Sequence, residues 1–128
     1  MYKSRHAIAS VFIEALGISM NFDELINSVE AELREGLCHW VDEWKKGDKD
    51  VEVLAYLVGK WHGNVWFKDT AASNKFYANF QEFKHIAIDD IGGLPLNERL
   101  YWFGLFEAWH GGDEPTQQRL RSKLHANA

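Results

Sequence analysis

Two Glu-x-x-His pairs are the residues in this sequence best suited to bind a metal. Glu82 with His85, and Glu107 with His110, are each three residues apart on predicted helices. Di-iron carboxylate bundles use such pairs together with a Glu from each of two other helices. Both pairs lie at the C-terminal ends of consecutive helices, so antiparallel packing would separate them. We therefore expect helix-end histidines that complement the helix dipole, and a helical metal-carboxylate protein remains an alternative.

A second group of polar residues lies further upstream. Glu35, His39 and Glu43 follow one another at intervals of four, where a cation could bridge two of them on a helix. A solvated helix face explains the same spacing, because such a face carries charge. The competing interpretation is that this side docks onto a basic surface, which would speed encounter with a partner. We predict no bound cofactor.

The sequence shows no residues arranged for nucleophilic catalysis. Cys38 and His39 are neighbours in a predicted helix, so their side chains point about 100° apart and do not face each other. Cys38 is expected to act as a small hydrophobic residue. The sequence also has no P-loop, no Gly-rich dinucleotide turn, no GxSxG and no HExxH motif. We predict that the protein is not an enzyme.

The longest helical pattern covers about residues 21–46 and has one apolar and one acidic side. The apolar side consists of Phe22, Leu25, Ile26, Val29, Leu33, Leu37, Trp40 and Trp44. The acidic side consists of Glu24, Ser28, Glu32, Glu35, His39 and Asp42, with Glu43 at its margin. Asn21 and Glu24 predict a capping box at the start, and Gly47 predicts the stop. We expect one central amphipathic helix.

The remaining segments predict an all-α fold, a single domain over residues 1–128 with five to six helices packed around the central one. Helices are expected over Ser4–Leu16, from Asp50 over 51–61, from Asp69 or Thr70 to about Phe83, from Pro95 to about His110, and from Asp113 and Pro115 to the C-terminal region. The β-branched Val51, Val53 and Val58 leave a buried strand possible for 51–61. The segment over 86–94 is predicted to be irregular, because its Gly-Gly and the Pro that follows break a continuing helix.

Aromatic residues are concentrated in two places. Val65, Trp66 and Phe67 lie in the predicted loop over 62–68, where they either fill the core or belong to an interface. The helix after Pro95 is apolar on nearly all sides, which predicts a central position or a contact with another chain. In the last helix, Leu120 and Leu124 are expected to face inward. Arg119, Arg121 and Lys123 are expected to face outward.

Charge and composition limit the classes of function. The chain carries 14 Lys and Arg against 19 Asp and Glu, a net charge of −5. This balance argues against binding nucleic acid, whose phosphates require basic side chains, and it favours a basic partner. No apolar run approaches the roughly 18 residues of a membrane span, and no signal peptide is recognised. With a single Cys, these features predict a cytoplasmic protein without disulfides.

One resemblance concerns the last third of the chain. The aromatic segment NERLYWFGLFEAW, followed by GGDEPTQQRLRSKL, resembles the small immunity proteins that bacteria encode beside contact-dependent growth inhibition toxins and related polymorphic toxins. The resemblance implies a protein that binds one cognate toxin domain, often a nuclease with a basic cleft, and blocks it without chemistry. No residue set of the family can be transferred to this chain.

The leading hypothesis is therefore a non-enzymatic inhibitory binding protein, an immunity protein for a basic, nuclease-type toxin domain. It would be a monomer when free and a heterodimer with the toxin. The predicted partner-binding residues are Glu24, Glu32, Glu35, His39, Asp42 and Glu43. One alternative is a phage-type inhibitor that uses the same acidic face to mimic nucleic acid. Another is a structural subunit that forms oligomers through the aromatic helix.

Overall fold

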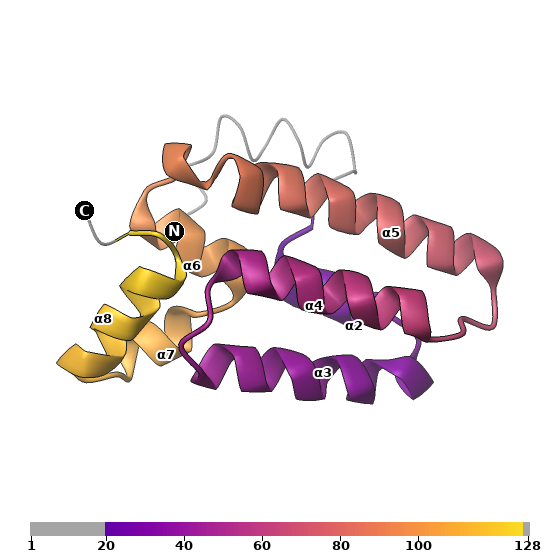
Figure 1. Ribbon diagram of the computed structural model, residues 1–128, viewed down its shortest axis with the longest axis horizontal. Coiled ribbons are helices and arrows are strands. Elements are labelled where there is room, and N and C mark those ends of the chain that lie inside the picture. The colour runs from indigo at the N-terminus through magenta and orange to yellow at the C-terminus, as the bar shows by residue number, and fades with distance from the viewer. Residues whose placement is uncertain (1–19, 127–128) are drawn as a thin grey trace.

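The computed structural model describes residues 20–126, and in this range the chain is helical without any β-strand (Figure 1). The α-helices are α2 (Phe22–Asn27), α3 (Ala31–Lys46), α4 (Val51–Asn64), α5 (Thr70–Lys84), α6 (Leu96–Phe103), α7 (Phe106–His110) and α8 (Glu114–Lys123). The predicted all-α class is confirmed for this part of the chain, with seven helices where five to six were expected. The predicted helix Ser4–Leu16 lies outside the described residues.

Three helices run back and forth along the long axis of the molecule. In Figure 1, α3, α4 and α5 alternate in direction, and α6, α7 and α8 gather at the end where α3 finishes and α4 begins. The short α2 contacts α3, α5 and α6, and its Phe22 and Leu25 are fully buried. Phe22 packs against Phe83 of α5, with 5.4 Å between the ring centroids. The element at the centre is therefore α2.

The predicted continuous helix over about 21–46 is wrong, because the chain breaks between α2 and α3 at residues 28–30. The Ser28 hydroxyl donates a hydrogen bond to the Leu25 carbonyl at 2.6 Å. Such local side-chain bonds compete with the backbone bonds that would continue the helix. Arg34 then reaches back and donates to the carbonyls of Val29, at 2.8 Å, and Asn27, at 3.3 Å. These bonds satisfy backbone groups that a continuous helix would have paired internally.

The break also changes which face of α3 is buried. Leu37, Val41 and Trp44 are buried, whereas Trp40, predicted to face the core, is 50% exposed. A single register drawn through residues 22–44 cannot include Val41 in the buried stripe. Because α3 starts afresh at Ala31, its core face is rotated towards Val41 and away from Trp40. The Trp40 indole therefore lies on the surface of the protein.

Residues 51–61 form a helix, so the strand alternative is wrong and the predicted cap is confirmed. The Asp50 carboxylate accepts from the amides of Glu52, at 3.1 Å, and Val53, at 3.2 Å. Partial burial raises the pKa of Asp50, but hydrogen bonds from His125 and these amides outweigh it, so the pKa lies below its ordinary value. Asp69 caps α5 in the same way through the amide of Ala71.

The segment over 86–94, predicted to be irregular, continues the helical path after α5. Residues His85–Asp89 form one π-helical turn, and Ile91–Gly93 form a 3₁₀ turn. Ala87, Ile88 and Ile91 are buried, which explains why this stretch stays coiled although Gly92 and Gly93 follow. Tertiary packing of these apolar side chains stabilises the coiled backbone, and local helix propensity does not predict that packing. Pro95 is the N-cap of α6 rather than part of its first turn.

The aromatic segment after Pro95 is divided at Gly104 into α6 and α7, where one helix was expected. Gly104 has φ +67°, and the Leu105 amide donates to the Leu100 carbonyl at 2.9 Å while Gly104 donates to Tyr101 at 3.3 Å. This pair of bonds is the Schellman motif, which ends a helix at a left-handed residue. The turn allows Leu100, Phe103 and Leu105 to be buried together.

Gly104→Ala is expected to lower the free energy of unfolding by about 1–2 kcal/mol, the cost of a left-handed conformation for a residue with a Cβ. The new methyl group would also meet the carboxylate of Asp23. Gly36→Ala is the matched control, because Gly36 lies inside α3 with open space around it. It is expected to stabilise the protein by about 0.5–1 kcal/mol. Denaturant unfolding measures the free energy of unfolding of both variants. Equal changes in the two variants would contradict the requirement for glycine at position 104.

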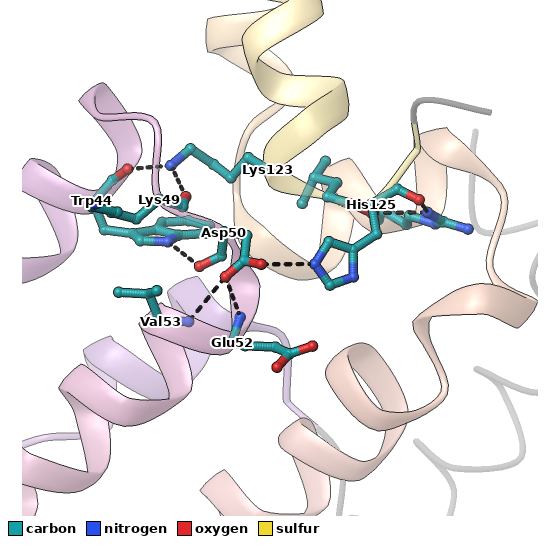
Figure 2. Close-up of polar contacts among 9 residues, drawn as sticks. Trp44, Lys49, Asp50, Glu52, Val53, Lys123 and His125 are labelled. Atoms are coloured by element: carbon teal, nitrogen blue, oxygen red, sulfur yellow. Dashed lines mark hydrogen bonds and ion pairs between the residues drawn. The ribbon is translucent and has the colours of Figure 1, made fainter.

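The outward position predicted for Lys123 is wrong, because this side chain is 0% exposed. Figure 2 shows its ammonium group between the end of α3 and the turn before α4. It donates to the carbonyls of Trp44, at 2.6 Å, and Lys49, at 2.5 Å, and lies 4.2 Å from the centroid of the Trp44 ring. Its carbonyl partners are more than 70 residues away in sequence, so no local pattern in α8 reveals them.

Two arginines fasten the same end of the molecule. Arg119, predicted to face outward, is half-buried and donates to the carbonyls of Lys45, at 3.0 Å, and Gly47, at 2.7 Å. Arg99 of α6 is buried and donates to the carbonyls of Leu124 and His125, both at 2.8 Å. These bonds attach α8 to the C-terminal end of α3 and to α6. The orientation of α3 is thereby fixed by α8.

Candidate partner-binding surface

Two of the six predicted partner-binding residues are engaged within the protein itself. The Glu24 side chain accepts from the Asn21 amide, and the Glu24 amide donates to the Asn21 side chain, both at 2.9 Å. This is the predicted capping box, now at the start of α2. Glu32 forms an ion pair with Lys68, and this hydrogen bond and charge raise the pKa of Lys68. The acidic side is therefore shorter than the sequence predicts.

The other four predicted residues share the solvent-facing side of α3, and we refer to Glu35, His39, Asp42 and Glu43 as the α3 acidic surface. All four are exposed. Within residues 20–126, no hydrogen bond or ion pair joins a side chain to the carboxylates of Glu35, Asp42 or Glu43. Lys46 lies one turn beyond Asp42 on the same helix. The surface thus retains a net negative charge that the described residues do not neutralise.

Trp40 lies at the edge of the α3 acidic surface. Its ring makes an edge-to-face contact with the His39 ring at 5.3 Å between centroids. Beside it is a pocket of about 460 Å³ between α3 and the second half of α4. Its lining residues are Trp40, Leu57, Lys60, Trp61, Asn64 and Val65. We call this the Trp40 pocket. The exposed indole and the apolar pocket are thus adjacent, and Glu43, one helical turn after Trp40, borders them.

The aromatic loop between α4 and α5 contributes to the same end of the molecule. Phe67 points inward, with its ring 6.1 Å from that of Trp61 and 6.2 Å from that of Phe76. Trp66 points outward and is 91% exposed. It directly follows Val65, which lines the Trp40 pocket. Val65, Trp66 and Phe67 were predicted either to fill the core or to belong to an interface. Phe67 packs into the core, and Trp66 has the exposure that an interface residue requires.

A larger groove of about 730 Å³ lies between α4 and α5. Tyr56 and Tyr77 flank it and are 64% and 49% exposed. Its walls carry charges of both signs, because Glu52, Lys84 and Asp89 all line it, and the last two are paired at 3.1 Å. Two carboxylates against one ammonium group give the groove lining only a weak negative balance. Among the lining residues of the Trp40 pocket, Lys60 alone is charged, and on the α3 side the pocket borders the α3 acidic surface.

The two Glu-x-x-His pairs are not assembled into a metal centre. His85 lies 3.6 Å from Asp90, and the His110 ring stacks on Phe106 at 5.8 Å between centroids. Among the described residues, no three His, Cys, Asp or Glu side chains are grouped closely enough to hold a metal ion. The same holds for Glu35, His39 and Glu43. The metal-carboxylate alternative therefore gains no support from the arrangement of these side chains.

Comparison of the chain with protein-family models, with curated proteins and with solved structures finds no match. The resemblance of the last third of the chain to immunity proteins therefore stays a hypothesis that rests on the sequence. In residues 20–126, every helix is too short or too polar to cross a membrane. The candidate surface consists of exposed residues of α3, α4 and the loop that follows α4.

Proposed function

We propose that this protein is a non-enzymatic inhibitory binding protein, of the immunity type, that neutralises a basic toxin domain by occupying its surface. Docking would use the α3 acidic surface and Trp40. The observation that carries the proposal is the exposed Trp40 on the same helix as carboxylates that have no side-chain partner among residues 20–126. Interfaces draw most of their binding energy from a few aromatic and Arg residues, while complementary charges set the association rate.

The break between α2 and α3 favours a protein partner over the nucleic-acid-mimic alternative. A mimic of phosphates requires a long track of negative charge, and the break leaves Glu24 outside the α3 acidic surface. An exposed indole next to an apolar pocket suits a protein surface, which offers side chains to fill it. The inhibitor would act by covering a basic cleft, so no residue of this chain needs to take part in chemistry.

Affinity purification of the protein from its native host, followed by mass spectrometry, identifies the partner. We expect a basic protein, which is then purified and mixed with this chain. Light scattering during gel filtration is expected to show one equimolar complex, and the toxic or nuclease activity of the partner is expected to be lost in the mixture. Separate elution with full partner activity would contradict the proposal. A partner that is inhibited only through a bound metal ion of this chain would contradict it as well.

A further inference from the structure

We infer that the Trp40 pocket receives one aromatic side chain of the partner, taken from a segment in which basic residues flank that aromatic residue. The inference rests on the proposed function and names the kind of segment that the surface recognises. Two independent features of the described residues support it. The first is the construction of the pocket floor, and the second is the distribution of charge around the rim.

The floor of the pocket is held rigidly from below. Trp61, which is almost fully buried, contacts Phe67 and Phe76 edge-to-face, at 6.1 and 5.5 Å between centroids and at 71° in each case. Phe67 comes from the loop and Phe76 from α5, so the Trp61 ring is fixed from two sides. A pocket that is already formed avoids the entropy cost of ordering side chains when a ligand binds.

Aromatic walls select the chemistry of the occupant. Trp40 and Trp61 both line the pocket, and Leu57 and Val65 complete its apolar surface. Aromatic rings pair in edge-to-face or offset geometry, which adds about 0.5–1.5 kcal/mol to the burial of area. An entering aromatic ring would also cover the exposed part of Trp40. A charged or small polar side chain would leave these walls in contact with water.

The rim supplies the charge that selects the flanking residues. Glu43 lies three positions after Trp40, one helical turn away on the same side of α3. Lys60 is the cation on the opposite wall, and its ammonium group lies 6.0 Å from the ring of Tyr56, a residue of the neighbouring groove. The α3 side of the pocket is therefore anionic. Lysine or arginine beside the inserted ring would meet Glu43.

Two short synthetic peptides test the inference on the intact protein. Both contain several lysines, and they differ only in a central residue, Phe in one and Ala in the other. Each is titrated at low salt into the isotopically labelled protein, and NMR spectra report the amides that shift. We expect the Phe peptide to bind about 10-fold more tightly, a gain of about 1.4 kcal/mol. We also expect nuclear Overhauser contacts from its ring to the methyl groups of Leu57 and Val65.

Each alternative result has a defined meaning. Equal binding of both peptides at the α3 acidic surface, without shifts at Leu57 and Trp61, would overturn the pocket inference and leave the proposed function standing. Failure of both peptides to bind would contradict the charge complementarity on which both ideas depend. Contacts from the Phe ring to Trp66 alone would overturn the inference. Shifts at the pocket on concentrating the protein without peptide would assign it to a second copy of the chain, and would overturn it too.

Discussion

Replacing Trp40 with alanine is expected to weaken partner binding about 100-fold, or about 2.7 kcal/mol. Trp40 is 50% exposed in the free protein, so burying its open face under a partner would remove apolar surface from water. The substitution also removes one wall of the Trp40 pocket. Calorimetric titration of the purified partner into each variant measures the change in dissociation constant.

Tyr77→Ala is the matched control for this substitution. Tyr77 is 49% exposed, nearly the same as Trp40, but it lies on α5 beside the other groove. We expect its dissociation constant to stay within about 3-fold of the original, in keeping with the small effect of residues outside an interface. Equal losses in the two variants, or no loss for Trp40→Ala, would contradict the placement of the binding surface.

Raising the pH from about 8 to 10.5 is expected to stabilise the folded protein through Lys123. Burial, with the nearby charge of Arg119, lowers the pKa of Lys123 to about 8, although Asp48 and Asp50 act in the opposite direction. The ordinary pKa of 10.5 applies to the unfolded chain. Between these values the unfolded state binds more protons, so the free energy of unfolding rises with pH. The gain from this residue is about 3 kcal/mol over the whole interval.

The comparison with Lys123→Met isolates this contribution, because other groups titrate equally in both proteins. Met keeps an apolar side chain over Trp44 but cannot donate to the Trp44 and Lys49 carbonyls shown in Figure 2. Denaturant unfolding at several pH values should show the original protein gaining about 3 kcal/mol relative to the variant as pH rises through this interval. Lys49→Met, in the same turn, is the control variant. It leaves Lys123 in place, so its free energy of unfolding should rise with pH as that of the original protein does. If the free energy of unfolding of Lys123→Met changed with pH in parallel with that of the original protein, the buried position and lowered pKa of Lys123 would be contradicted.

Local sequence signals predicted the starts of four helices, α2, α4, α5 and α8. At each of these starts, the side chain of the capping residue accepts a hydrogen bond from a backbone amide in the first turn. The capping residues are Asn21, Asp50, Asp69 and Asp113. Capping requires only residues within three positions of each other, so the sequence contains all the information. Apolar residues at helical spacing are buried in α4 and α5, among them Leu54, Val58, Phe76 and Phe80. The all-α class depends on these local features.

The breaks within helical patterns could not be predicted in the same way. An apolar stripe runs through residues 28–30 without interruption, and the break there depends on Arg34 reaching back to Val29. Gly104 could be taken as a tolerated glycine until its left-handed conformation was known. Lys123 has the sequence context of a surface residue, and its burial is explained by the carbonyls of Trp44 and Lys49 and by the Trp44 ring. The burial of Lys123 is decided by contacts between distant segments.

The candidate site was predicted in part. Glu35, His39, Asp42 and Glu43 lie together on α3, as the spacing of four and three residues requires. Trp40 was assigned to the core, because the phase of the helix was carried across a break that the sequence pattern does not mark. Trp66 offered a signal as one of three consecutive apolar residues in a loop. Which of the three faces solvent depends on packing against Trp61 and Phe76.

The most direct test of the electrostatic docking surface is the association rate with the purified partner at low salt. Glu35, Asp42 and Glu43 are changed together to Lys in one variant. In the control variant Glu52, Glu107 and Glu114, exposed carboxylates outside α3, are changed to Lys, so both variants have the same net charge. Stopped-flow measurements should show the α3 variant associating about 10- to 100-fold more slowly than the control, a difference that shrinks as salt screens the charges. Equal association rates for the two variants would contradict docking through the α3 acidic surface.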